Sequence, residues 1–141
     1  MPRSLALTLG EPAGIGPDIT IAVWRRRAEL ALPPFYLIAD AAFMRRRADR
    51  LGASVPIEVV APQDAARAFA EALPVVELDH PVTAEPGRPD RSSAPAAIAA
   101  IRRAVADVIS GTAGAVVTNP VAKNVLHSFT MCSPSSTGPS K

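Results

Sequence analysis

Residues 10–18 of this sequence read GEPAGIGPD and have the composition of a ligand-binding turn between a strand and a helix. Glycines allow close approach of the backbone, and the start of a helix offers unpaired N–H groups to an anion. The string is neither standard phosphate motif, because Pro17 and Asp18 replace the P-loop Lys and Ser or Thr, and Ile19 replaces the third glycine of the dinucleotide fingerprint. Two interpretations remain, a structural turn, which these departures favour, and an anion contact. The candidate binding residues in this loop at the helix start are Gly10, Glu11, Gly14 and Gly16.

A second string, AVVTNPVAK at residues 115–123, places polar side chains after a short apolar strand. Open α/β sheets bind ligands at the carboxyl ends of their strands. Lys123 could meet a phosphate or carboxylate of a substrate, and Thr118 or Asn119 could orient it by hydrogen bonds. The alternative, an ordinary polar loop with a solvated Lys123, is favoured on the residues alone.

The other residue types that carry chemistry are sparse. His80, His127 and Cys132 are the only histidines and the only thiol, and they lie in unrelated contexts, whereas a catalytic zinc usually takes three protein ligands. No serine or cysteine lies in a nucleophile elbow, and neither histidine has a recognisable orienting carboxylate. We therefore assign no metal ligand and no catalytic residue.

Charge patterning argues against a nucleic-acid partner. The net charge is +2 with 4% aromatic residues, too little of either for nucleic-acid binding. Two arginine runs, 25–27 and 45–47, fall on predicted helices, and we interpret both as solvated faces.

Short aliphatic runs alternate with Ala- and Arg-rich segments, which predicts βαβ units and an α/β fold with a mostly parallel sheet. The predicted strands are Leu5 to Leu9, Phe35 to Ala39, Ile57 to Val60, Val75 to Leu78 and Ala115 to Thr118. The predicted helices are Gly16 to Leu30, Ala41 to Leu51, Gln63 to Ala72 and Ala94 to Ser110. In the last of these, Ile98, Ile101, Val105 and Val108 recur at helical spacing, and Ser93 with Pro95 predicts a cap and first turn.

Residues 80–95 hold four prolines and predict an extended connection. We expect residues 1–127 to form the α/β portion, and residues 128–141, rich in serine without apolar periodicity, to be a divergent, disordered tail. Neither a signal peptide nor a membrane-spanning run is predicted, and Cys132 has no partner for a disulfide. A cytoplasmic location follows as an expectation.

Three strings carry a resemblance to a known family: TLGEPAGIGPD, GRPDRSSAPAAIAAIRRAVADVISG and AVVTNPVAKNVL. Together, over residues 2–126 and in this order, they resemble the 4-hydroxythreonine-4-phosphate dehydrogenases. The resemblance implies an α/β/α sandwich similar to isocitrate and isopropylmalate dehydrogenases, a homodimer, and an active site between two domains. It also implies a divalent metal and NAD(P), used to oxidise 4-phosphohydroxy-L-threonine with decarboxylation in vitamin B6 biosynthesis.

The resemblance stops after Leu126, where the family continues into a Gly-His-Thr-Glu motif and this chain reads HSFTMC. His127 does not match that motif, and the family's metal-binding histidines have no counterpart here. We therefore expect a truncated N-terminal portion, from a frameshifted or prematurely ended gene, that binds neither metal nor NAD(P) and is inactive alone. Two alternatives stay open: a non-catalytic module that binds a phosphorylated ligand or pairs with a full-length relative, and a portion of a related erythronate or threonate phosphate dehydrogenase.

Overall fold

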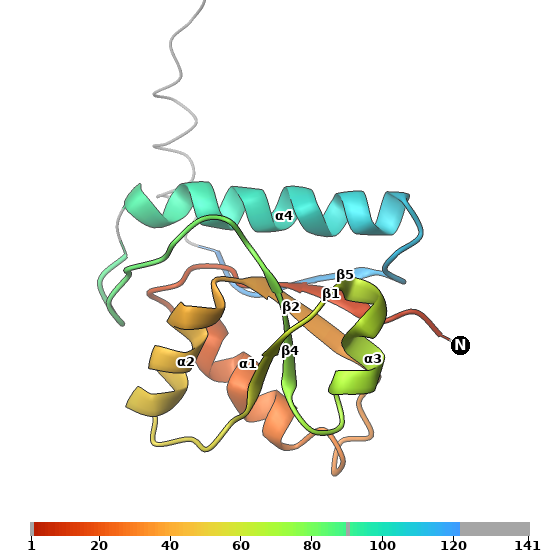
Figure 1. Cartoon of the computed structure of the whole chain (residues 1–141). Coiled ribbons are helices and arrows are strands. Elements are labelled where there is room, and N and C mark those ends of the chain that lie inside the picture. Colours follow the sequence, from red (N-terminus) through yellow and green to blue (C-terminus); the bar gives the residue numbers. More distant parts are fainter. Residues whose placement is uncertain (1, 90, 122–141) are drawn as a thin grey trace, which may run out of the picture.

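The structure is a computed structural model, and it describes residues 2–89 and 91–121. Five strands form one parallel sheet in the order β3-β4-β2-β1-β5 (Figure 1). Their bounds are β1 Leu5–Thr8, β2 Phe35–Ala39, β3 Ile57–Val59, β4 Leu73–Glu77 and β5 Val116–Thr118. The predicted α/β fold with a mostly parallel sheet is confirmed.

Strand β2 lies at the centre of the sheet, and all five of its residues are buried. A central strand of a parallel sheet is covered on both faces, so an unbroken apolar run suits it better than an alternating one. For this reason the predicted bounds of β2 agree with the structure at both ends.

Helices cover both faces of the sheet. Helices α1 (Gly16–Arg25) and α2 (Ala41–Arg50) lie on one face, where Ile21, Trp24 and Met44 pack with Leu37 and Val75. Helix α4 (Ala94–Ile109) runs along the opposite face (Figure 1), where Ala100 and Ala104 contact the cluster that includes Tyr36 and Ile38. The short α3 (Ala65–Ala68) contributes Ala65 to the same cluster. The result is an α/β/α arrangement.

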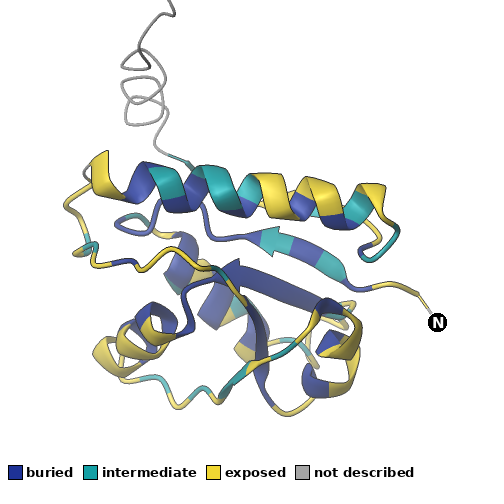
Figure 2. Cartoon of the chain, turned by 45° about the horizontal axis from the view of Figure 1, so that its top comes forward, coloured by how far each residue is buried: buried dark blue, intermediate teal, exposed yellow. Residues whose placement is uncertain are grey.

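Helix α4 has the predicted position, and it buries mainly its small side chains. Its buried positions are mainly alanines, including Ala97, Ala100 and Ala104, whereas Val105 is 44% exposed. Figure 2 shows buried and exposed positions alternating along this helix. Small side chains let a helix approach a sheet closely, so the packing favours the alanine face over the face with larger side chains. The helical spacing of Ile98, Ile101, Val105 and Val108 thus predicted the helix correctly, although Val105 is exposed and the other three are half-buried.

Two helices are shorter than predicted, and side chains near the end of the first donate to carbonyls just beyond the end of the second. Helix α1 ends at Arg25 rather than Leu30, and the Arg27 guanidinium donates to the carbonyl of Trp24 and stacks 3.8 Å from its ring centroid. Helix α3 ends at Ala68 rather than Ala72. Just after it, the carbonyl of Phe69 accepts the Trp24 indole N–H at 3.1 Å, and the carbonyl of Ala70 accepts a hydrogen bond from the Arg27 guanidinium. The predicted helix over Gln63 to Ala72 is a 3-10 turn at Pro62–Asp64 followed by α3.

The segment from residue 80 to 89 connects β4 to a 3-10 turn at Arg91–Ser93 and, as predicted, contains no helix or strand of its own. Asp40 holds it through the Val82 N–H at 2.9 Å, and Gly87 donates to the carbonyl of Ala13 at 2.8 Å. Across residues 2–89 and 91–121, no helix is long and apolar enough to cross a membrane. Lys123, His127, Cys132 and the predicted tail at 128–141 lie outside the described residues.

Candidate functional site

The two sequence strings meet at the carboxyl ends of β1 and β5. From β1 the chain passes through α1 to β2 on one side, and it reaches β5 on the other side after α4, which covers the opposite face. This is the point where the strand order reverses, and open α/β sheets place their ligand crevice there. Thr8 pairs with Thr118, so the loop after β1 and the loop after β5 leave the sheet side by side.

The glycines of the first loop are packed against the second loop. A Cβ atom at Gly10, which has φ of 74°, would lie 2.4 Å from the carbonyl oxygen of Pro120. A Cβ atom at Gly16 would lie 2.6 Å from the Leu9 oxygen and 3.1 Å from the Asn119 Cβ. The Glu11 N–H donates to the Pro120 carbonyl at 2.8 Å, which fixes the spacing of the loops. At Gly10 and Gly16 the close backbone approach is therefore made to protein, which supports the structural turn.

Asn119 connects three elements at this edge. It is 8% exposed, and its Nδ2 donates to the Thr8 carbonyl and to the Thr20 Oγ1, each at 3.0 Å. The Thr20 hydroxyl in turn donates to the carbonyl of Gly16 at 2.9 Å. One amide group thus ties the end of β5 to β1 and to the first turn of α1.

Glu11 holds the loop from the other side. Its carboxylate is 8% exposed and accepts from the Ala13 N–H and from the Ser93 Oγ, both at 3.1 Å. Ser93 has the predicted N-cap position of α4 but makes no side-chain cap hydrogen bond to that helix. The predicted positions of Ser93 as the N-cap and of Pro95 in the first turn are therefore confirmed, but the Ser93 hydroxyl bonds to the buried Glu11 carboxylate instead of capping the helix.

Arg47 also contacts the loop after β1, which the sequence did not predict. Its side chain is 5% exposed, and its Nε and NH2 donate to the two Asp18 carboxylate oxygens at 2.6 and 3.1 Å. NH2 also donates to the Gly14 carbonyl at 2.9 Å. The prediction of a solvated face is thus wrong for Arg47, although Arg45 and Arg46 are exposed. Helical spacing carries the signal, because Arg47 lies four and three residues after the buried Phe43 and Met44.

The structure brings together most of the candidate binding residues. Gly10, Glu11, Gly14 and Gly16 share one loop, and Asn119 fills the space beside it. Thr118 is exposed at the end of β5, so its side chain lies on the open side of this edge. Lys123 lies outside the described residues. Ligand contacts of all these residues stay predictions.

The described part of the chain does not fit a divalent-metal site. Within it, no group of three or more His, Cys, Asp or Glu side chains could hold a metal ion. At the shared edge, Glu11 is the buried carboxylate, and its oxygens are already bonded to Ala13 and Ser93. The arrangement therefore supplies a rigid, hydrogen-bonded edge rather than a set of metal ligands.

Comparison with known proteins identifies a family and several relatives. The family model of pyridoxal phosphate biosynthetic protein PdxA matches residues 31–138. A 4-hydroxythreonine-4-phosphate dehydrogenase of Bradyrhizobium diazoefficiens is 62% identical over 133 residues, covering 89% of this chain and 39% of the relative. One from Methylorubrum populi is 54% identical and is covered over 36% of its length, so the chain spans less than half of these curated relatives.

Among solved structures, a 4-hydroxythreonine-4-phosphate dehydrogenase from Burkholderia phymatum superposes with a TM-score of 0.81 at 24% identity. The alignment covers 92% of this chain and 39% of that one. At this identity the superposition shows the fold alone.

Proposed function

The chain belongs to the family of pyridoxal phosphate biosynthetic protein PdxA, and we propose that it is the N-terminal part of an NAD-dependent 4-hydroxythreonine-4-phosphate dehydrogenase. The reaction would be oxidation of 4-phosphohydroxy-L-threonine with decarboxylation, as a step of vitamin B6 biosynthesis. The observation that carries the proposal is the family match, supported by the joining of the GEPAGIGPD and VVTNP strings at one edge of the sheet.

The role proposed for this chain is to build one wall of the active site. Asn119 and Glu11 fix the loop between β1 and α1, and Thr118 stays exposed beside it. Thr118, Asn119 and Lys123 would contact the phosphorylated substrate. The divalent metal and NAD(P) are proposed to bind through parts of the relatives that this chain does not match, and a homodimer in the cytoplasm is proposed for the whole enzyme.

Apolar surface next to β5 supports the idea that more polypeptide covers this edge. Ile19 and Val117 are 39% and 44% exposed, and a cavity of about 210 Å³ lies between them and β1. Its walls are almost entirely apolar, with Leu5, Leu7 and Val23 among them. Exposed apolar patches of this kind mark interaction surfaces.

A chimera tests the proposal. Residues 1–121 of this chain would replace the matching segment of the Bradyrhizobium diazoefficiens relative, and oxidation of 4-phosphohydroxy-L-threonine would be followed by NADH absorbance with a divalent metal present. We expect an active chimera and no activity from the 141-residue chain alone. A folded, inactive chimera would refute the proposed function, and activity of the isolated chain would refute its proposed dependence on the remainder.

The two alternatives predict other outcomes. A chimera that prefers erythronate or threonate phosphates would indicate a sister dehydrogenase. A non-catalytic module would bind a phosphorylated ligand or a full-length relative without turnover, and calorimetry or co-purification would detect either.

A further inference from the structure

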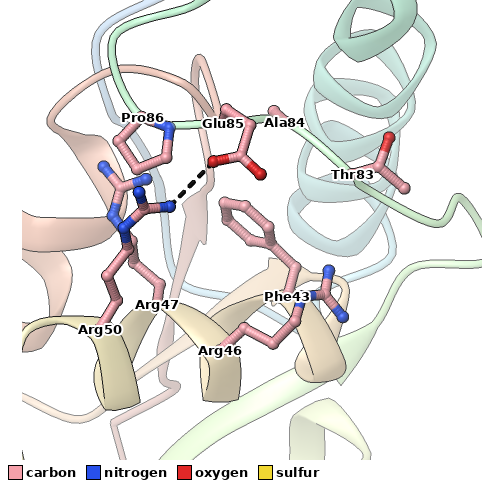
Figure 3. Close-up of a pocket in the computed structure, with 8 residues that line it drawn as sticks. All are labelled: Phe43, Arg46, Arg47, Arg50, Thr83, Ala84, Glu85 and Pro86. Carbon is pink, nitrogen blue, oxygen red and sulfur yellow. Dashed lines mark hydrogen bonds and ion pairs between the residues drawn. The ribbon is translucent and has the colours of Figure 1, made fainter.

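A second pocket, which shares Arg47 with the loop at the sheet edge, lies between α2 and residues 83–86. It has a volume of about 220 Å³ and is lined by Phe43, three arginines of α2 and the segment from Thr83 to Pro86 (Figure 3). Arg47 and Arg50 extend from α2 toward Glu85 and Pro86, and Arg46 extends beside Phe43 (Figure 3). The arginine run found in the sequence therefore contributes two of the three guanidinium groups of this pocket, Arg46 and Arg47.

Arg47 has a hydrogen-bonding group that its known contacts leave unused. Its Nε and NH2 bond to Asp18 and Gly14, but the buried NH1 has no acceptor in the described part of the chain. A buried guanidinium N–H without an acceptor is costly, and a bound water or ion is one way to satisfy it. Among the described residues, two buried side-chain atoms have no partner, and this one belongs to a residue that lines the pocket between α2 and residues 83–86.

The charge of the pocket favours a dianion. Arg47 is balanced by Asp18 and Arg50 by Glu85, whereas Arg46 donates at 2.7 Å to the neutral carbonyl of Val82. One positive charge is left over. The side chains of Arg50 and Glu85 are 61% and 63% exposed. An exposed ion pair contributes little stability, so another anion can readily replace the Glu85 carboxylate at Arg50. If Glu85 turns outward, the pocket carries two uncompensated positive charges.

From the buried NH1 of Arg47, the pocket beside it and the exchangeable Arg50–Glu85 pair, we propose that this pocket binds a phosphate dianion, free or as a monoester. The ligand would take one guanidinium N–H from Arg47 and a pair from Arg50, displacing the Glu85 carboxylate. Guanidinium groups suit this role because their planar donors match phosphate oxygens. Hydrogen bonding to Arg50 lowers the pKa of the Glu85 carboxyl, so Glu85 is an ionised competitor at neutral pH. This site goes beyond the proposed function and does not depend on it.

Calorimetric titration of the 141-residue chain with inorganic phosphate at low ionic strength tests the site. Arg50→Gln should weaken binding about tenfold, because it removes a charge-assisted donor pair. Glu85→Gln should tighten binding about threefold, because it removes the competitor. Arg45→Gln is the matched control: it removes one exposed charge from the same helix outside the pocket and should change the affinity less than about twofold.

The opposite changes in phosphate affinity expected for Arg50→Gln and Glu85→Gln distinguish a specific site from general electrostatic attraction. Equal weakening by Arg50→Gln and Arg45→Gln, no gain in Glu85→Gln, absence of phosphate binding, or acetate binding as tight as phosphate would each overturn the proposal. O-phosphoserine in a parallel titration distinguishes the two sources: tighter binding than phosphate assigns a monoester, and weaker binding assigns the free ion. Circular dichroism confirms that the variants, all at exposed positions, keep the fold.

Discussion

Asn119→Ala should destabilise the protein strongly although the residue follows β5, an edge strand of the sheet. The substitution removes both hydrogen bonds of Nδ2, to the Thr8 carbonyl and to the Thr20 hydroxyl, from a side chain that is 8% exposed. A hydrogen bond contributes about 1 kcal/mol net, and leaving buried partners unpaired costs more. With the lost packing against Gly10 and Gly16, we expect a decrease of about 2–4 kcal/mol in the free energy of unfolding.

Urea denaturation followed by the fluorescence of Trp24 measures this change. Trp24 is the single tryptophan of the sequence and is 5% exposed, so its emission reports loss of the α1 core. Thr118→Ala is the matched control, because the neighbouring side chain is exposed and should change stability by less than about 0.5 kcal/mol. Equal midpoints for the two variants would refute the role assigned to Asn119.

A double-mutant cycle isolates the contact between β5 and α1. Thr20→Val keeps the side-chain shape but removes the hydroxyl that accepts from Asn119 and donates to Gly16. Residues in contact within one hydrogen-bond network couple by about 0.5–3 kcal/mol. The double variant should therefore lose less than the sum of the single variants, and strict additivity would show that the two side chains act independently.

Three further predictions concern the loop, the core and the partly buried ion pair of Arg47 and Asp18. Gly16→Ala should cost about 2 kcal/mol or more in the same urea assay, because its Cβ would lie 2.6 Å from the backbone oxygen of Leu9, and a midpoint within error of the unsubstituted chain would contradict this close approach. Tyr36→Phe should cost about 1–3 kcal/mol by removing the 2.7 Å hydrogen bond to Asp107. Burial first, then that hydrogen bond, raise the pKa of Tyr36, so its contribution to stability is complete below the ordinary tyrosine pKa of about 10 and decreases as pH rises beyond it. Unfolding measured across that alkaline range should show a smaller decrease in the Phe variant, and parallel curves would refute the assignment. Arg47→Lys should cost about 2–4 kcal/mol because an ammonium cannot reproduce the paired contact with Asp18, whereas Arg45→Lys should leave the midpoint unchanged.

The sequence predicts the sheet better than it predicts what the helices bury. In β2 every residue is buried, so the apolar run and the strand coincide from Phe35 to Ala39. In α4, Pro95 and Gly111 mark the ends, but alanines and aliphatic residues lie at competing helical spacings. Hydrophobic periodicity favours burial of the larger aliphatic side chains, whereas close packing of the helix on the sheet buries Ala100 and Ala104.

The contacts made near the ends of α1 and α3 could not be predicted from the sequence because their partners lie far apart in the chain. Trp24 donates to Phe69 across 45 residues, and Arg27 donates to Ala70 across 43. The contacts of Glu11 with Ser93 and of Arg47 with Asp18 likewise span 82 and 29 residues. A loop's composition predicts that a turn exists, but the partners of its polar groups depend on the order of strands in the sheet.

The spacing of the glycines in GEPAGIGPD has a structural explanation that includes the second string. Gly10 and Gly16 lack side chains because the backbone and Cβ of Asn119 and the carbonyl of Pro120 occupy that space. The two strings therefore form one unit, and a larger side chain at either glycine would displace the residues that follow β5. Any ligand role then falls on groups that this packing leaves available, such as the exposed Thr118, rather than on the glycines themselves. The hydrogen bonds of Asn119 maintain the edge that such groups would use.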